Sequence, residues 1–480
     1  MKNRQPLVAG RRRAWLAIVL IFIGSLSALD PGLGWAQQGG GNQGGQGGNQ
    51  GGQGGQGGNQ GNRAGGVAID AEGVLTVAIG KETTDKLALK RLEAVAKETL
   101  GRDLAKFSAL RKVSLVKLEK AVSKRLEDKQ PVPSDMQFLA GLQRIDFVFI
   151  YPESGDLVIA GPAEGFAGNS VGRVVGITTG RPPLRLDDLI VGLRVGRRGT
   201  IGCSIDPVPE NHAKMLAAAK LNSGPATPDA IAAKYQNLTK ILGNQVVSVN
   251  GVPADSHFAQ VMVEADYRMK LMSVGRELPR VNGFHSQLDY QKPGDTIYQR
   301  WWFTPLYDSL KTTDDGDAYQ FSGQRLQLLS QDEFISVSGQ RTPATERFSS
   351  QKYAKIFTEK MPELAVAVPV IGELQNLTDI AILSALIRRE NLASKLNWKM
   401  DVFLDATKLP HASGPTPLKV PSIGNWKRSG QLMLGMIGGV TIHADSTLDR
   451  MADSAEKSRD LGSSRSRSVM PTDLATWWWD

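Results

Sequence analysis

The chain has 480 residues, of which 41% are hydrophobic and 22% are charged, so it can bury a core of ordinary size. Five basic residues and one aspartate lie in residues 1–36, so the formal net charge of +9 falls to +5 over the rest of the chain. This weak charge, with no aromatic residues interleaved among basic ones, gives no reason to expect nucleic acid as a partner. The single cysteine, Cys203, excludes an internal disulfide, so the fold rests on core packing.

Residues 1–36 have the pattern of an export signal peptide. A basic start precedes an apolar run from Ala14 to Leu29, which is too short to cross a membrane comfortably. Small residues at Gly34 and Ala36 predict cleavage after Ala36. The arginine pair at 12–13 loosely resembles a twin-arginine signal, although the general secretory route fits at least as well. The export route and the retention of the signal as an anchor stay open, but either way we expect a periplasmic, cell-surface or secreted protein.

A segment built almost only of glycine, glutamine and asparagine follows at 37–66. Such a segment cannot bury apolar surface, so we expect a disordered linker before a folded region at 67–445. No later apolar run approaches 18 residues, which predicts no membrane span once the signal is removed.

The first part of the folded region, 67–133, combines a β-hairpin with charged helices. Apolar residues on both sides of Asp70–Gly73 predict the hairpin. Fourteen basic and eight acidic residues between Lys81 and Lys129 indicate a solvated helical surface, with a surface for an acidic partner as the alternative. Within this region Ser114 is expected to cap a helix.

Strands and helices alternate through the second part, 134–296. Phe147–Tyr151 and Leu157–Ala160 flank a turn and predict a second hairpin. The alternation predicts a mixed or parallel sheet covered by helices. Further strands are expected at 174–177, 200–205 and 246–249, and helices at 187–194, 209–221, 230–242 and 256–272.

The third part, 297–445, changes to apparently antiparallel strands and then to helices. The whole therefore predicts an α+β or mixed α/β fold, in which β-hairpins and a mixed sheet carry packed helices. Strands are expected at 301–303, 319–321, 326–329, 401–404 and 439–442, and helices at 345–360 and 362–390.

The polar tail, 446–480, is rich in serine and arginine, so we expect it to be disordered almost to its last residues. Three tryptophans at 477–479 are unfavourable in water, and we expect them to form a docking element. A loosely exposed end is the alternative.

One group of polar residues could form a hydrolase-type site. The expected helix over 255–268 places His257, Glu264 and Arg268 close to one face, while Asp266 points elsewhere. A carboxylate beside an imidazole can orient a general base, but helix capping and an ordinary Glu264–Arg268 ion pair explain the same residues.

The second half of this hypothetical site would come from loops after strands, at 161–166, 179–182 and 203–206. A cleft joining these loops to the helix would favour catalysis, whereas a packed core there would favour a structural role. The candidate catalytic residues are His257, Glu264, Asp266, Ser204 and Asp206.

Other motifs predict structure rather than chemistry. Cys203 lies in an apolar strand and is expected to be a buried core residue. The five histidines form no close pair, and the glycine-rich loops lack the spacing of nucleotide-binding loops, so we expect neither a metal nor a cofactor. Asp314–Asp317 lacks the distal glutamate of a calcium loop and predicts a turn.

Four separate segments resemble a known family when taken in order. They are Tyr151–Phe166, Thr179–Pro182, Cys203–Pro207 and Val263–Lys270. Together they are similar to exported planctomycete proteins that carry the domain of unknown function 1598, over about residues 66–445. The resemblance implies one shared domain architecture, and it brings no activity with it.

Two functional hypotheses follow. The first is a non-enzymatic exported protein that has a structural role or binds an unknown macromolecule of the cell envelope or periplasm. Its basis is the flexible linker, the aromatic end of the chain and the lack of a catalytic motif. The alternative is a hydrolase-type enzyme that uses the candidate residues named above.

Overall fold

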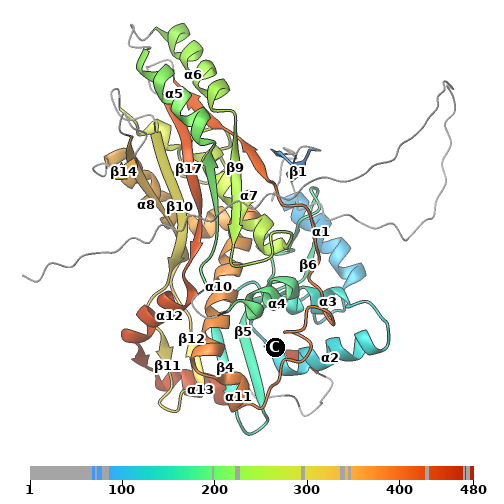
Figure 1. Ribbon diagram of the computed structural model, residues 1–480. Coiled ribbons are helices and arrows are strands. Elements are labelled where there is room, and N and C mark those ends of the chain that lie inside the picture. Colours follow the sequence, from blue (N-terminus) through green and yellow to red (C-terminus); the bar gives the residue numbers. More distant parts are fainter. Residues whose placement is uncertain are drawn as a thin grey trace, which may run out of the picture. The chain divides into compact units, whose positions relative to one another are not determined.

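Two large β-sheets with helices packed against them form the framework of the described chain (Figure 1). All the described residues belong to one unit, Asn59–Asp480, whereas the expected signal peptide and linker, 1–36 and 37–66, lie outside the described residues. The architecture confirms the α+β class expected from the sequence. The computed structural model describes residues 67–70, 73–77, 86–196, 199–221, 227–292, 298–335, 341–343, 347–427, 432–468, 471 and 476–480.

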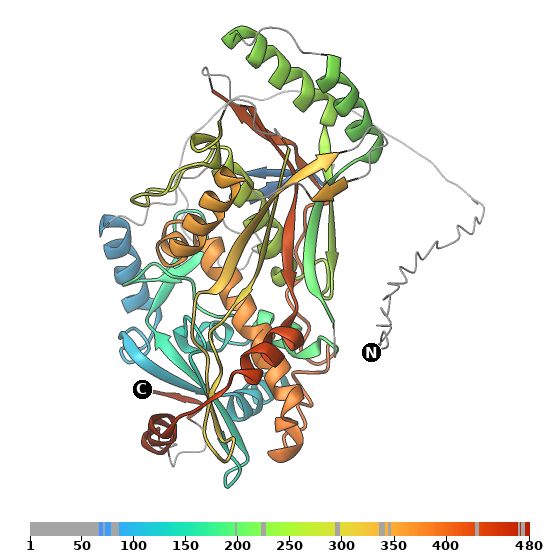
Figure 2. The ribbon, with the colours of Figure 1, turned by 90° about the vertical axis from the view of Figure 1, so that its left-hand side faces the viewer.

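The larger sheet has eight strands in the order β14-β13-β10-β17-β8-β9-β15, with β16 paired to β17. Its pairs are antiparallel except for β10 and β17, which run parallel, so the sheet is mixed. Figure 2 shows β10, β17 and β8 side by side, with helix α12 at their lower end. The strands are β8 (Ile201–Pro207), β9 (Asn244–Asn250), β10 (Tyr298–Leu306), β13 (Arg325–Ile335), β14 (Arg341–Pro343), β15 (Lys419–Pro421), β16 (Ile423–Trp426) and β17 (Leu432–Ile442).

The second sheet has seven strands in the order β18-β11-β12-β4-β5-β3-β19. Its centre is the expected hairpin of β4 and β5, and two more hairpins, β1–β2 and β6–β7, stand as separate small sheets. The remaining strands are β1 (Val67–Ile69), β2 (Leu75–Val77), β3 (Ser108–Ser114), β4 (Phe147–Tyr151), β5 (Asp156–Ala163), β6 (Phe166–Gly168), β7 (Val174–Gly176), β11 (Lys311–Thr312), β12 (Ala318–Gln320), β18 (Glu456–Lys457) and β19 (Trp478–Trp479).

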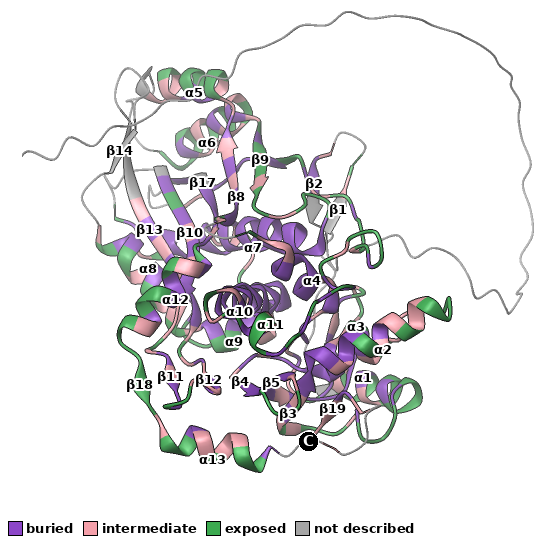
Figure 3. Cartoon of the chain, turned by 60° about the horizontal axis from the view of Figure 1, so that its bottom comes forward, coloured by how far each residue is buried: buried purple, intermediate pink, exposed green. Residues whose placement is uncertain are grey.

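The helices pack around one large apolar core, and two smaller apolar clusters lie apart from it. Figure 3 shows α7 and α10 buried along almost their whole length. The helices are α1 (Lys86–Thr99), α2 (Leu115–Glu127), α3 (Ser134–Gln137), α4 (Leu186–Arg194), α5 (Pro209–Leu221), α6 (Pro228–Leu242), α7 (His257–Ser273), α8 (Phe348–Glu359), α9 (Met361–Ala367), α10 (Pro369–Arg389), α11 (Leu392–Lys395), α12 (Ala444–Asp453) and α13 (Arg459–Arg467).

Helix α10 is the central helix of the core. Its 21 residues are long and apolar enough to cross a membrane by length and composition, and it is the one helix of the described chain that passes this test. Its apolar stretch is wholly buried inside the protein, so it acts here as a core helix. The expected single helix over 362–390 is divided at Val368–Pro369, because a proline cannot continue the hydrogen-bond ladder of α9.

Most strands and helices expected in the second part are present. The cap expected at Ser114 is confirmed, and Ser256 caps α7 in the same way, since each hydroxyl accepts a backbone N–H of the following helix. The turn expected at 314–317 connects β11 to β12. Cys203 is 5% exposed, and burial raises the pKa of its thiol, as expected for a core cysteine.

The expectation of helices throughout 81–129 is wrong at its centre, where β3 forms a strand. The strand could not be recognised from the sequence, because its charged residue Arg111 points into the protein where an apolar residue would be expected. Its guanidinium donates to the carbonyl oxygens of Leu104 and Ala140 at 3.1 and 2.8 Å. Hydrogen bonds from a buried charge to backbone acceptors replace the apolar contact that would have revealed the strand.

The strand expected at 401–404 is also wrong, because this apolar segment forms a turn. The carboxylate of Glu119 on α2 accepts the backbone N–H groups of Val402 and Phe403 at 2.7 and 2.8 Å and the indole N–H of Trp398. A distant side chain therefore satisfies the backbone that a neighbouring strand would otherwise have paired.

The expectation of a disordered tail is wrong for the residues described between 446 and 480. Helix α12 buries Leu448 and Met451, and α13 buries Leu461 against the second sheet. Although the tail is polar, Leu448 and Met451 lie three residues apart on one face of α12, and the single apolar residue of α13, Leu461, is enough to dock that helix.

The docking of the tryptophans is confirmed, and their partner is this same chain. Trp477 is buried, and its carbonyl accepts the N–H of Ser114 at 2.8 Å. Trp478 and Trp479 form β19, an antiparallel strand beside β3. The carboxylate of Asp480 then pairs with the buried guanidinium of Arg111 at 2.8 Å.

Candidate functional site

Helix α7 carries three of the five candidate catalytic residues. Its N-terminus is fixed by Ser256, and the helix packs against β8 and β17 of the larger sheet and against α10. All residues from His257 to Lys270 are buried. The polar residues of α7 therefore face other protein groups, and its charged residues need partners inside the core.

His257 is paired with Asp188 of α4. The two side chains are each 5% exposed, and Nδ1 of the imidazole lies 2.9 Å from the nearer carboxylate oxygen. Nε2, on the other side of the ring, lies 4.0 Å from a carboxylate oxygen of Glu373 on α10. The imidazole is thus oriented by one carboxylate and faces another, whereas a general base in a Ser–His pair would face a hydroxyl.

Glu264 belongs to a buried ion network that includes Glu373. Both oxygens of Glu264 accept from Nη2 of Arg173 at 2.7 and 2.8 Å, and Nη1 of the same arginine pairs with Glu373. Arg268, one turn along α7, lies 3.5 Å from Glu264 and also pairs with Glu277. Burial raises the pKa of Glu264, and the two arginines oppose this shift.

Asp266 forms a second, separate pair with Lys270 on the same helix. Their charged atoms are 2.9 Å apart, and the side chains are 0% and 1% exposed. They lie directly beneath Gly438 of β17, where an added Cβ would collide with both side chains. Glycine at this position lets the strand approach the ion pair, and burial raises the pKa of Asp266.

Ser204 and Asp206 point away from α7. In β8, Ile205 pairs with Gly438, the glycine that faces Asp266 and Lys270. Directly paired residues point to the same side of a sheet, and neighbours along a strand alternate. Ser204 and Asp206 therefore lie on the opposite face, where both are partly exposed. Across the described chain, the five candidate residues share no cleft.

The segments 161–166 and 179–182 do meet, through Glu164. The expected loop at 161–166 is mostly strand, because only Glu164 and Gly165 lie between β5 and β6, and the expected loop at 203–206 lies inside β8. The buried carboxylate of Glu164 accepts the backbone N–H groups of Thr178 and Thr179 at 2.7 and 3.0 Å. The amide of Gln143 and the hydroxyl of Thr179 also donate to this carboxylate. All four donors come from the protein itself, so this carboxylate braces the two segments.

A further buried network connects the two large sheets. Arg325, at the start of β13, pairs with Asp379 of α10 at 3.0 Å and with Asp146 at 2.6 Å. Tyr307 donates its hydroxyl to Asp379 at 2.6 Å, and burial together with this carboxylate raises the pKa of Tyr307. Arg325 adopts φ 71°, an unusual backbone conformation that this set of contacts holds in place.

Four residues that complete these networks were not predicted from the sequence: Arg173, Asp188, Glu373 and Asp379. The two acids of α10 were visible as isolated charges in a long apolar stretch, and such charges need partners when they are buried. Arg173 gave no comparable signal, because it lies in a glycine-rich turn. In the described ranges, no group of three or more histidine, cysteine, aspartate or glutamate residues could hold a metal ion.

Residues 203–286 match the family model described as "Protein of unknown function (DUF1598)". The match contains all five candidate residues and two of the four segments that carry the resemblance, Cys203–Pro207 and Val263–Lys270. Tyr151–Phe166 and Thr179–Pro182 lie outside it. No curated protein and no solved structure matches the chain.

Proposed function

We propose that this is an exported, non-enzymatic protein of the cell envelope or periplasm, which has a structural role or binds an envelope macromolecule. The signal-like pattern at 1–36 and the polar segment at 37–66 support the location. The ordered fold that follows would then be held outside the cytoplasm behind this Gly/Gln/Asn segment.

The observation that carries the non-enzymatic part is the pairing of the buried acid–base groups. His257, Glu264 and Asp266 each contact a buried partner of opposite charge or a carboxylate. These contacts connect α7 to α4, α10 and the hairpin of β6 and β7. Side chains used in this way brace the packing of α7, and none of them faces the hydroxyl of Ser204.

The location is tested by N-terminal sequencing of the protein isolated from its producing cells, together with fractionation of those cells. We expect the sequence to begin at Gln37 and the protein to be found outside the cytoplasm. A cytoplasmic protein with an intact N-terminus would contradict the proposal. An intact N-terminus in the membrane fraction would instead make residues 1–36 an anchor.

The non-enzymatic role is tested by complementing a deletion strain with variants of the proposed hydrolase residues. Ser204→Ala and Asp206→Asn change partly exposed side chains on the open face of β8, so both should be produced normally and restore the wild-type phenotype. His257→Gln should affect the phenotype only as far as it lowers the amount of folded protein. If a variant has the abundance and melting temperature of the wild type but fails to restore the wild-type phenotype, this role is contradicted.

The hydrolase hypothesis is the second candidate, because the Asp188–His257 contact has the arrangement that orients an imidazole in acid–base catalysis. It requires the core around α7 to open, so that Nε2 of His257 can reach a nucleophile. A panel of chromogenic esters and glycosides tests it. Turnover that is abolished in both His257→Gln and Ser204→Ala would favour this alternative.

A further inference from the structure

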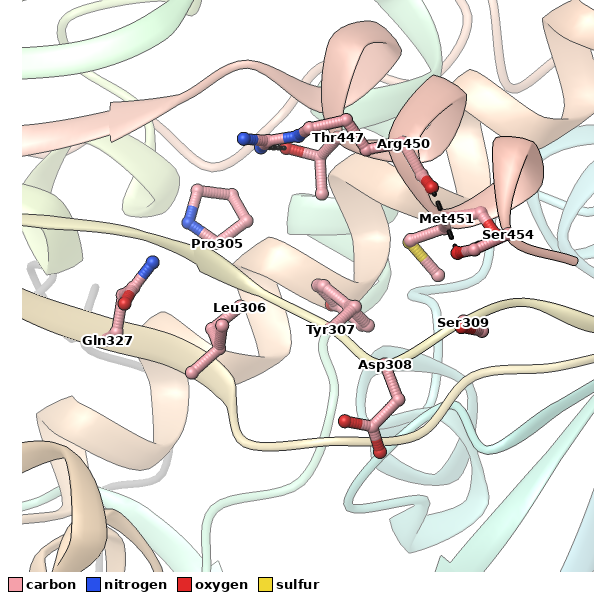
Figure 4. A pocket seen from close by; sticks show the side chains of 10 residues that line it. All are labelled: Pro305, Leu306, Tyr307, Asp308, Ser309, Gln327, Thr447, Arg450, Met451 and Ser454. Carbon is pink, nitrogen blue, oxygen red and sulfur yellow. Dashed lines mark hydrogen bonds between the residues drawn. The ribbon is translucent and has the colours of Figure 1, made fainter.

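A cavity lies where the end of the larger sheet meets helix α12 (Figure 4). Its volume is about 470 Å³, which is within the range of pockets that hold small organic molecules. One wall comes from β10 and the segment after it, including Pro305 and Ser309. Gln327 of β13 and Thr447, Arg450 and Met451 of α12 form the other walls.

The walls of this cavity are held by backbone contacts. The N–H of Leu310 donates to the carbonyl of Met451 at 2.9 Å, and the N–H of Glu456 donates to the carbonyl of Leu310 at 2.8 Å. On the other side of α12, Asp445 and Asp449 pair with Arg388 and Arg389 of α10. The helix is therefore fixed against the strand, and the cavity is formed before any ligand arrives.

Three side chains offer unused donors to the cavity. Nη2 of Arg450 donates to the hydroxyl of Thr447 at 3.2 Å, and within the described ranges no carboxylate lies within ion-pair distance of this guanidinium. The side chains of Gln327 and Ser309 have no hydrogen-bond partner among the described residues. In Figure 4, the Arg450 guanidinium and the Gln327 amide lie on either side of Pro305.

The acidic and phenolic groups at the cavity are directed elsewhere. An added Cβ on Gly323 would lie 3.2 Å from the carboxylate of Asp308, and Figure 4 shows this side chain pointing away from α12. The hydroxyl of Tyr307 is engaged by Asp379. The cavity therefore presents one positive charge, neutral donors and the apolar surfaces of Pro305 and Met451.

We propose that this cavity binds a small organic oxyanion, a carboxylate or a phosphate ester. Its charged group pairs with Arg450 and accepts from Gln327 or Ser309, and its apolar body packs against Pro305 and Met451. Arginine suits both anions because its planar fork matches their oxygens. This site goes beyond the proposed function, since it requires neither export nor an envelope partner.

The test is isothermal titration calorimetry on the purified full-length chain. The probes are benzoate, citrate, glucose 6-phosphate and inorganic phosphate, with benzamide and glucose as neutral counterparts. We expect at least one organic anion to bind saturably and its neutral counterpart to bind at least about tenfold more weakly, because a charge-assisted hydrogen bond is lost. Tighter binding of glucose 6-phosphate or of a carboxylate identifies the anion class, and inorganic phosphate reports how much the organic body contributes.

Two arginine variants separate the cavity from general surface charge. Arg450→Gln should weaken binding of the best probe about tenfold or more, whereas Arg459→Gln, on the exposed face of α13, should change it less than twofold. Ser309→Trp, which fills the cavity, should abolish binding at an unchanged melting temperature. Absence of saturable binding by every anion, equal binding of a neutral counterpart, or equal effects of the two arginine variants would overturn the proposal.

Discussion

Asp266 and Lys270 lie one turn apart on α7, and both are removed from solvent beneath Gly438. Taking two charges out of water is unfavourable, and only their mutual attraction and nearby hydrogen bonds offset it. Removing one partner leaves the other charge buried alone. Removing one member of the pair should therefore destabilise the fold by more than the intact pair stabilises it.

We expect Lys270→Met to lower the free energy of unfolding by about 3–5 kcal/mol, because Asp266 then remains as an unpaired buried carboxylate. The double variant Asp266→Leu/Lys270→Met should recover most of this loss. Urea unfolding followed by tryptophan fluorescence measures both.

The control is the exposed pair of Lys97 and Glu93 on α1, whose charged atoms are 2.7 Å apart. Lys97→Met should change the free energy of unfolding by less than about 1 kcal/mol, because water screens this pair. Similar losses for Lys270→Met and Lys97→Met would show that the buried pair is solvated.

At the scale of single elements, β19 is a two-residue strand that fixes the end of the described chain to β3. Trp477, the residue before this strand, is buried, while Trp478 packs its ring against the guanidinium of Arg111 at 4.7 Å. So short a strand has few backbone bonds, and side-chain packing must supply its stability.

We expect Trp477→Ala to lower the free energy of unfolding by about 3–5 kcal/mol, as for other buried aromatic residues that leave a cavity. Trp479→Ala, at a partly exposed position, should have a smaller effect. Thermal unfolding by circular dichroism measures both variants. If Trp477→Ala melts with the wild type, the docked tryptophans contribute nothing to the fold.

Helix α13 is attached to the second sheet in a way that depends on pH. The hydroxyl of Tyr151 on β4 donates to the carbonyl of Ser468 at 2.9 Å, and burial raises the pKa of Tyr151 to about 12. The folded protein therefore holds this proton more tightly than the unfolded chain. Its stabilising effect is complete below about pH 10 and is lost as the pH rises through about 12.

We expect Tyr151→Phe to reduce the fall in melting temperature between pH 10 and pH 12, because one proton that the folded state retains has been removed. The same variant should melt below the wild type at pH 8, where it lacks the hydrogen bond to Ser468. A pH series of melting curves tests both effects. An unchanged slope would mean that Tyr151 titrates alike in the folded and unfolded chains.

At the scale of the whole molecule, both large sheets combine distant parts of the sequence. β10 is paired with β17, and β11 with β18. Helix α10 then joins the sheets, since Glu373 reaches Arg173 and Asp379 reaches Arg325. Neither large sheet can be assembled from one continuous third of the chain.

We therefore expect 67–480 to unfold in one cooperative step. Tryptophan fluorescence, far-ultraviolet circular dichroism and calorimetry should give coincident transitions. The buried pair of Asp379 and Arg325 offers a check, because Asp379→Asn should shift all three transitions together. Two separate transitions in the wild type would show that the sheets are independent units.

Local patterns were enough to predict many elements. Helix α2 follows from apolar spacing and a serine cap, and the hairpin of β4 and β5 follows from two apolar runs around a turn. Two segments were predicted wrongly because distant residues satisfy their polar groups. β3 depends on the burial of Arg111, and the turn at 401–404 depends on Glu119.

The candidate site was predicted only in part, for the same reason. Residues on one helix, such as Glu264 and Arg268, could be grouped from their spacing. The partners that decide their role come from other elements, as Asp188, Arg173 and Glu373 do. The direction of Ser204 depends on its register with β17, which no single-strand pattern contains.

The late position of β17 has a consequence for the order of events at the ribosome. Its neighbours β10 and β8 are made well before residues 432–442, yet they pair with this strand and not with each other. A nascent chain that has emerged only as far as α10 therefore still has a gap at the middle of its larger sheet. Until β17 is synthesised, the facing edges of β10 and β8 have no partner strand and remain accessible to chaperones. Any apparatus that threads extended polypeptide would then meet a chain whose larger sheet has not yet formed.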